Sequence, residues 1–290
     1  MRSSRRRRLV ATGLLGFACA IALTVSAPLS RTAASPAALP DLDQEAPTDI
    51  SVRDHVVGGQ HSYLLGFRSA VDNIGDGPLT VVGHRPSTST PTMTVDQIVE
   101  RPGQADEVVR DVGLMHYAIS PDHQHWHYLA FERYQLQTAE LRRAGSTEVL
   151  LEDQKTGFCL GDRYALPPPA LPAAPPRKVY TGRCGLSDPD LLRVRAGISV
   201  GYGDAYEAYL EGQDLPLDGL PDGRYVLVHR VNVDHGLRET SYRNNAASVL
   251  LSLEWHAGRP SLQLLASCPE SAACDEAPAA APATPFGSEP

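Results

Sequence analysis

The stretch PDGRYVLVHRVNV, residues 221–233, decides the fold class of this chain. It opens with a Pro-Asp-Gly turn and continues as a valine-rich run, a composition typical of a strand that follows a tight turn. In an extended strand every second side chain lies on the same face, so Tyr225, Leu227 and His229 face one side together. We therefore predict a β-strand over residues 224–233.

Similar strand-like runs recur along the chain, separated by turns rich in Gly, Asn and Asp. The runs lie at 63–71, 79–83, 125–136 and 247–255, and the turn signals at 72–79, 221–225 and 243–245. Short strands at this spacing are typical of a sandwich or a barrel. We predict an all-β fold, an antiparallel β-sandwich with long loops and little helix.

Helical signals are few. TVDQIVER, residues 94–101, predicts a short helix with Thr94 as its N-cap. LQTAELRRA, residues 136–144, suits either a helix or the edge of a hairpin. The proline-rich segment 166–177 predicts a surface loop, because proline has no N–H to donate to a sheet.

The two ends of the chain predict segments outside the folded domain. Residues 1–34 begin with a run of arginines followed by an apolar stretch, the order found in secretory signal peptides. The arginines also permit twin-arginine export, and an uncleaved signal would retain the protein at the membrane. We expect cleavage and a secreted protein without a stable membrane anchor. The Ala/Pro-rich residues 275–290 predict a disordered tail, which leaves one domain at 39–266.

The charge balance argues against a nucleic-acid partner. Six of the 26 basic residues lie in 1–34, where there is no acid, so the remaining chain has 20 basic against 34 acidic residues. An acidic surface repels phosphates and attracts cations such as amines, although net negative charge is also an ordinary aid to solubility.

Four cysteines follow the signal segment: Cys159, Cys184, Cys268 and Cys274. An even count in an exported chain predicts two disulfides. Three pairings are possible, and the simplest joins neighbours in the sequence.

Three histidines alternate in PDHQHWHYLAF, residues 121–131, at positions 123, 125 and 127. On a strand, His123, His125 and His127 share one face and can turn their ring nitrogens toward one metal ion. The alternative is a solvated row of histidines, which the neighbouring Trp126 and Tyr128 make less favourable because they predict a buried strand. Three imidazoles suit copper, zinc, iron or nickel, and the spacing alone does not choose among them.

Further segments carry a resemblance to a known family. HQHWHY at 123–128 is followed by EDQKTGFCLGD at 152–162, GQDLPLDGLPDGRYVLVHRVN at 212–232 and ETSYRNNA at 239–246. In this order and spacing, the four segments resemble the catalytic domain of the lysyl oxidase family, in a smaller, bacterial-type version. The resemblance also includes LPDL at 39–42 and LLGFRSAVDNIGDGPL at 64–79, and spans about residues 39–255.

The resemblance implies a copper amine oxidase. The histidine triplet matches the family's Cu(II) ligands, while Lys155 and Tyr225 match the lysine and tyrosine that form its lysine tyrosylquinone cofactor. The implied reaction uses oxygen to convert a primary amine, either peptidyl lysine or a small amine, to an aldehyde with release of hydrogen peroxide and ammonia. From the residues alone, Lys155 would be an ordinary surface lysine and Tyr225 a core tyrosine.

Some family members also bind Ca²⁺, and the matching positions are Asp41, Leu42, Glu239, Asn244 and Asn245. Ser241 stands where the family has an aspartate, which would weaken the site. The alternative is that Glu239 and the Asn-Asn pair only shape a turn.

The general base is not identified by the sequence. Asp214, Asp218 and Asp222 are the candidates, and a histidine that animal members carry shortly after the triplet has no counterpart here. Two other functions compete with an amine oxidase: an exported metal-binding protein without catalysis, and a zinc or iron enzyme, for which Glu132, the first acid after the triplet, is the candidate carboxylate.

Overall fold

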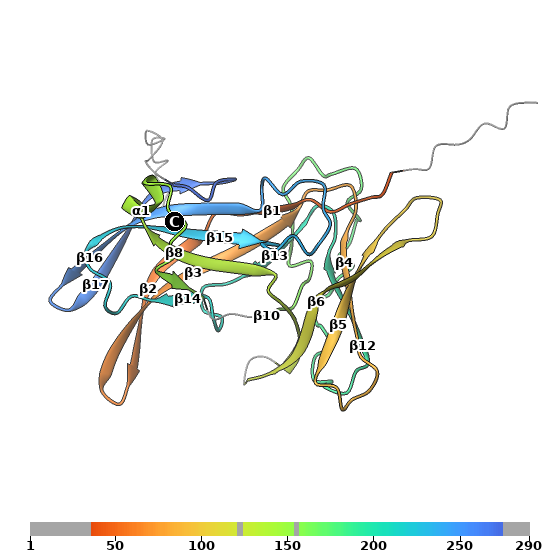
Figure 1. Ribbon diagram of the computed structural model, residues 1–290, viewed down its shortest axis with the longest axis horizontal. Coiled ribbons are helices and arrows are strands. Elements are labelled where there is room, and N and C mark those ends of the chain that lie inside the picture. Colours follow the sequence, from red (N-terminus) through yellow and green to blue (C-terminus); the bar gives the residue numbers. More distant parts are fainter. Residues whose placement is uncertain (1–35, 121–123, 154–156, 275–290) are drawn as a thin grey trace, which may run out of the picture. The chain divides into compact units, whose positions relative to one another are not determined.

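The computed structural model describes residues 36–120, 124–153 and 157–274, and in this part the chain forms strands almost throughout (Figure 1). All paired strands are antiparallel, and they are divided among three sheets that share one hydrophobic core. The predicted all-β, antiparallel fold is confirmed. The predicted signal segment 1–34 and the tail 275–290 lie outside the described residues.

The first sheet is built around the long strand β3 (Gln60–Asn73). Its other strands are β1 (Leu42–Gln44), β2 (Thr48–Val57), β11 (Tyr164–Ala165), β13 (Tyr202–Tyr206) and β14 (Asp214–Pro216). Strand β3 presents alternate residues such as Leu65 and Phe67 to the core, where both are fully buried.

The second sheet carries the histidines and has the order β10-β7-β6-β5-β4-β12. Its strands are β4 (Leu79–His84), β5 (Thr92–Val99), β6 (Glu107–Ile119), β7 (Gln124–Leu129), β10 (Gly157–Phe158) and β12 (Arg193–Ile198). The helix predicted over 94–101 is wrong, because Thr94 and the residues after it belong to β5. The pairing of β5 with β6 shifts register between Val95 and Gln97. Such a bulge disturbs the two-residue alternation and gives the apolar residues a helix-like spacing.

The third sheet has the order β17-β16-β15-β8-β9, and Figure 1 shows β15, β16 and β17 beside one another. Its strands are β8 (Glu132–Thr138), β9 (Leu151–Glu152), β15 (Gly223–Val231), β16 (Ala246–His256) and β17 (Arg259–Cys268). The helix α1 (Ala139–Arg143) follows β8, and Thr138 caps it by accepting a hydrogen bond from the Leu141 N–H. For residues 136–144 the sequence allowed either a helix or a hairpin edge, and the helix is therefore confirmed over residues 139–143.

Strand β15 is buried on both faces. Leu227 and Val231 pack into the core shared by the three sheets, whereas Val226 and Val228 pack on the other face against Ala139 and its neighbours. A central strand covered on both sides explains the uninterrupted apolar run Val226–Val228.

Two disulfides connect neighbouring cysteines. Cys159 is bonded to Cys184 and Cys268 to Cys274, the simplest of the three pairings. The predicted loop at 166–177 is also confirmed, as it forms no strand or helix. Within the described ranges, no helix is both long and apolar enough for a membrane span.

Candidate functional site

Two of the three predicted histidines lie side by side on β7. The Nε2 atoms of His125 and His127 are 2.8 Å apart, and their ring centroids are 4.7 Å apart. This separation suits an N–H···N hydrogen bond, and it also suits two nitrogens that share one metal ion. His123 lies outside the described residues.

Contacts on the opposite face of β7 hold the histidines in place. Trp126 points into the core, and the Arg85 guanidinium lies 4.6 Å from the centre of its ring. The Trp126 backbone N–H donates to the Cys184 carbonyl at 2.8 Å, and its indole N–H donates to the Asp188 carbonyl at 3.1 Å. Because successive side chains alternate between faces, fixing Trp126 fixes the direction of His125 and His127.

The segment that follows the predicted lysine runs beside β7. Gly157 pairs with Leu129, and Phe158 with Tyr128. A Cβ atom at Gly157 would lie only 2.5 Å from the Cβ of His127, so glycine is required for this close approach. Lys155 lies outside the described residues.

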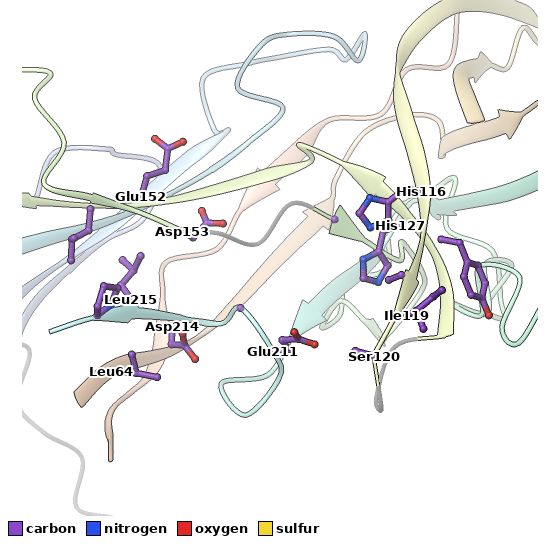
Figure 2. Close-up of a pocket in the computed structure, with 16 residues that line it drawn as sticks. Leu64, His116, Ile119, Ser120, His127, Glu152, Asp153, Glu211, Asp214 and Leu215 are labelled. Atoms are coloured by element: carbon purple, nitrogen blue, oxygen red, sulfur yellow. The ribbon is translucent and has the colours of Figure 1, made fainter. Parts of the chain in front are cut away.

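A cavity of about 820 Å³ opens beside His127, and we call it the histidine cavity. His116 from β6 and His127 lie on one side, and Asp153, Glu211 and Asp214 lie on the other (Figure 2). Asp153 and Gly157, which flank the segment containing Lys155, both line it. Burial lowers the pKa of His116, which favours its neutral form.

The acidic lining of this cavity could not be seen in the sequence. Glu132, the first acid after the triplet along the chain, is instead buried and accepts hydrogen bonds from Ser69 and from the Tyr134 hydroxyl. Glu211 and Asp214 are far from the histidines in sequence and line the same cavity only because β14 pairs with β3. No local sequence signal marks such a contact.

Of the three candidate bases, only Asp214 lines the histidine cavity. Its Oδ2 accepts a hydrogen bond from Arg53 at 2.7 Å. Asp218 accepts hydrogen bonds from the Ser62 hydroxyl and a backbone N–H, and Asp222 accepts one from the backbone of Trp255. Asp218 and Asp222 therefore attach their segment to strands β3 and β16.

A second cavity of about 530 Å³, which we call the arginine cavity, is lined by His125, His127 and Arg163. Arg163 is paired with the fully buried Asp204 at 3.1 Å, and Asp204 also accepts the Tyr206 hydroxyl at 2.9 Å. Burial raises the pKa of Asp204 to about 6, an effect that Arg163 opposes. The pair places a guanidinium on this side of the histidines, with its charge balanced by Asp204.

Tyr225 is not among the residues that line either cavity. It is buried, and its hydroxyl donates a 2.7 Å hydrogen bond to the Pro221 carbonyl. Burial raises the pKa of its hydroxyl. Tyr225 pairs with Thr138 on β8, whereas the cavity residue Asp153 contacts Tyr134, four residues earlier. At ~3.3 Å per strand residue, roughly 13 Å separates Tyr225 from this edge of the cavity.

The predicted calcium ligands come together in a second location. Glu239 accepts hydrogen bonds from the Leu42 N–H and from the amides of Asn232 and Asn245, and burial raises its pKa to about 7. The Asn244 amide donates to Asp41 at 2.9 Å. Ser241 instead accepts a hydrogen bond from a nearby backbone N–H in the turn.

Together, the fold and the site define a disulfide-bonded all-β protein with an imidazole cluster at the edge of an acidic cavity. A family model described as lysyl oxidase matches residues 103–259, and the chain belongs to the lysyl oxidase family. The match contains the histidine strand, Lys155 and Tyr225, but begins after the segments at 39–79 that were also expected to resemble the family. A search of curated proteins finds no matching relative. The family supports amine oxidation as the general function.

Proposed function

We propose that this protein is a copper-dependent amine oxidase that converts primary amines, either peptidyl lysine or small amines, to aldehydes with release of hydrogen peroxide and ammonia. The observation that supports this most strongly is the imidazole pair of His125 and His127 at the edge of an acidic cavity. The segment that contains Lys155 begins and ends at residues of the same cavity.

The described histidines fit copper. Two nitrogens bound at ~2.0 Å and at right angles to one metal are ~2.8 Å apart, as the Nε2 atoms of His125 and His127 are. Right angles suit the tetragonal geometry of Cu(II). His123, His125 and His127 would hold the ion, and Arg85 with Trp126 would keep the strand in position.

Lys155 and Tyr225 are the proposed precursors of lysine tyrosylquinone, a group that would supply a carbonyl for the amine and a sink for its electrons. Because Tyr225 lies outside both cavities, we expect the cross-link to draw its ring away from the Pro221 carbonyl. The protein contributes binding and proton transfer. The cavity carboxylates attract the substrate ammonium, and the Oδ1 atom of Asp214 would accept the α-proton while Arg53 holds Oδ2.

The two disulfides fit an oxidising compartment, and we propose that the protein is secreted. Export would use the signal at 1–34. The run of arginines in this signal would permit the twin-arginine route. Retention at the membrane by an uncleaved signal is the minor alternative.

Calcium is proposed as a second, structural ion at Asp41, Leu42, Glu239, Asn244 and Asn245. The Oδ1 atoms of Asn244 and Asn245 are buried and have no hydrogen-bond partner among the described residues. Turning these amides would direct the oxygen of Asn245 toward Glu239 and that of Asn244 toward Asp41 in place of N–H, as Ca²⁺ requires. Millimolar Ca²⁺ is then expected to raise the unfolding temperature of the native chain but not that of a Glu239→Gln variant. Equal temperatures with and without Ca²⁺ would contradict the site.

A competing function is that of an exported metal-binding protein without catalysis. Its support is the position of Tyr225, whose hydroxyl already has a partner away from the cavities. A peptide mass map after aerobic copper loading separates the two functions. We expect the Lys155 and Tyr225 peptides to migrate as one cross-linked species, and separate unmodified peptides would rule out the quinone.

A Tyr225→Phe variant provides the matched functional test. It removes one hydroxyl and retains the ring, so copper binding is expected to persist while peroxide release from primary amines stops. Oxidase activity in this variant would overturn the proposal.

A further inference from the structure

We propose that His116 is a further ligand of the copper ion, an imidazole supplied by β6 to the histidines of β7. The assignment rests on copper being the metal of the proposed function. It adds a residue outside the histidine triplet, from a different strand.

The register of the two strands places His116 next to His127. The residues are directly opposed in the antiparallel pair of β6 and β7. Opposed Cβ atoms are ~4.5–5.5 Å apart, whereas residues two apart on one strand are separated by ~6.6 Å. The backbone therefore brings His116 closer to His127 than it brings His125.

The rings have a separation that one metal ion can bridge. The centroids of His116 and His127 are 5.9 Å apart with an interplanar angle of 28°, and Figure 2 shows both rings on the same side of the histidine cavity. With nitrogens ~2.0 Å from a metal, ring centroids are ~4.5 Å apart at a right angle and ~6.4 Å apart on opposite sides. Both the 5.9 Å pair and the 4.7 Å pair of His125 and His127 fall in this range.

Unlike His61 and His84, His116 has no competing partner among the described residues. Neither of its nitrogens forms a hydrogen bond or ion pair with the described residues, whereas His61 is bonded to Asp54 at 2.8 Å and His84 approaches Asp96 at 3.3 Å. Within the described ranges, no three His, Cys, Asp or Glu side chains already converge as metal ligands. Coordination therefore requires His116 to rotate its ring toward His127, a side-chain movement that needs no change in the backbone.

The test is electron paramagnetic resonance of Cu(II)-loaded protein, comparing the native chain with His116→Gln and His116→Phe. We expect both variants to lose one nitrogen from the superhyperfine pattern and to bind Cu(II) about tenfold or more weakly. His61→Gln, which removes an exposed imidazole that lines neither cavity, is the matched control and should reproduce the native spectrum and affinity. Spectra and affinities of the His116 variants that equal those of the native chain would overturn the assignment.

A measurement on the native chain covers the case in which both variants misfold. Histidine modification with diethyl pyrocarbonate, mapped by mass spectrometry, should label His116 in the metal-free protein and spare it once Cu(II) is bound. Equal labelling in the two states would contradict coordination. The Lys155–Tyr225 cross-link is measured separately on the same samples. If the cross-link forms but the Cu(II) spectra of the His116 variants equal the native spectrum, only the new ligand is refuted. If the His116 variants lose a nitrogen from the Cu(II) spectrum but no cross-link forms, only the quinone is refuted.

Discussion

His229 is a single residue whose surroundings predict how the protein responds to acid. It is fully buried between Phe67 and Tyr134, with ring centroids 4.8 Å and 4.4 Å away. Neither of its nitrogens has a hydrogen-bond partner among the described residues. Burial lowers its pKa to about 3, whereas an exposed imidazole titrates near ~6.5.

The sign of the effect follows from this difference. Below pH ~6.5 the unfolded chain binds a proton at His229 that the folded chain does not accept until about pH 3. The contribution of neutral His229 to the free energy of unfolding is therefore fully present above pH ~6.5. It is lost as the pH falls, by up to ~1.4 kcal/mol per pH unit. Between pH 6.5 and 5 the native chain should lose ~2 kcal/mol more than His229→Leu, as measured by urea unfolding. Leu227→Val, on the same face of β15 and without a titratable group, is the control, and it should keep the native slope. Equal slopes for the native chain and His229→Leu would contradict the prediction.

Asp214 provides a residue-scale test of the catalytic proposal. Asp214→Asn keeps the size of the side chain but cannot accept a proton, so the rate of amine oxidation should fall by about 10²–10⁴-fold. Copper binding and the cross-link should remain, because Asp214 touches neither histidine in the structure. Asp218→Asn and Asp222→Asn should keep most of the activity, since both residues bind the backbone of strands, β3 and β16, outside the cavity. A larger loss in either of these two than in Asp214→Asn would assign the base elsewhere.

The strands were easier to predict than their bulges. The strand-like runs at 63–71 and 224–233 lie largely within the long strands β3 and β15, because their β-branched and apolar side chains favour buried strand positions. The register shift beside Val95 made a strand look like a helix. A bulge is set by the two flanking strands, which local sequence does not describe.

At the scale of elements, the Cys159–Cys184 disulfide should matter for copper as well as for stability. Cys159 follows β10, which pairs with β7, and the Cys184 carbonyl accepts the Trp126 N–H, so the bond joins two segments that flank the histidine strand. Replacing both cysteines by alanine should cost about 3.5 kcal/mol and also weaken Cu(II) binding.

The second disulfide is the matched control for this prediction. Cys268 and Cys274 close a much shorter loop at the end of β17, so their loss should cost only about 2.4 kcal/mol and leave Cu(II) affinity unchanged. Urea unfolding and copper titration on both variants measure the two effects. If both variants lost copper affinity equally, the Cys159–Cys184 bond would have no specific role at the site.

At the scale of the whole molecule, the histidine cavity exists only because three sheets meet. Its lining includes Leu64 from the first sheet, His116 and His127 from the second and Leu151 from the third. The sequence could predict the histidine triplet because its members are neighbours along one strand. It could not predict His116, Glu211 or Asp153 at the same cavity, because their proximity depends on how strands distant in sequence pair.

The acidic wall of that cavity predicts how substrates are chosen. Carboxylates on the side facing His116 and His127 should favour amines with two positive charges over amines with one, because the second ammonium can pair with the wall. Glu211→Gln should raise the KM for a diamine about two- to fivefold with little change in kcat, the size expected for one partly solvated ion pair.

Added salt should reduce the preference for the diamine in the native chain, since exposed charges are screened. Glu254→Gln is the control, as this exposed residue of β16 pairs with His256, lines neither cavity and should leave KM unchanged. Steady-state kinetics with a diamine and a monoamine of equal chain length, at low and high salt, measure all three effects. A preference for the diamine that does not change with salt or with Glu211→Gln would show that shape rather than charge selects the substrate.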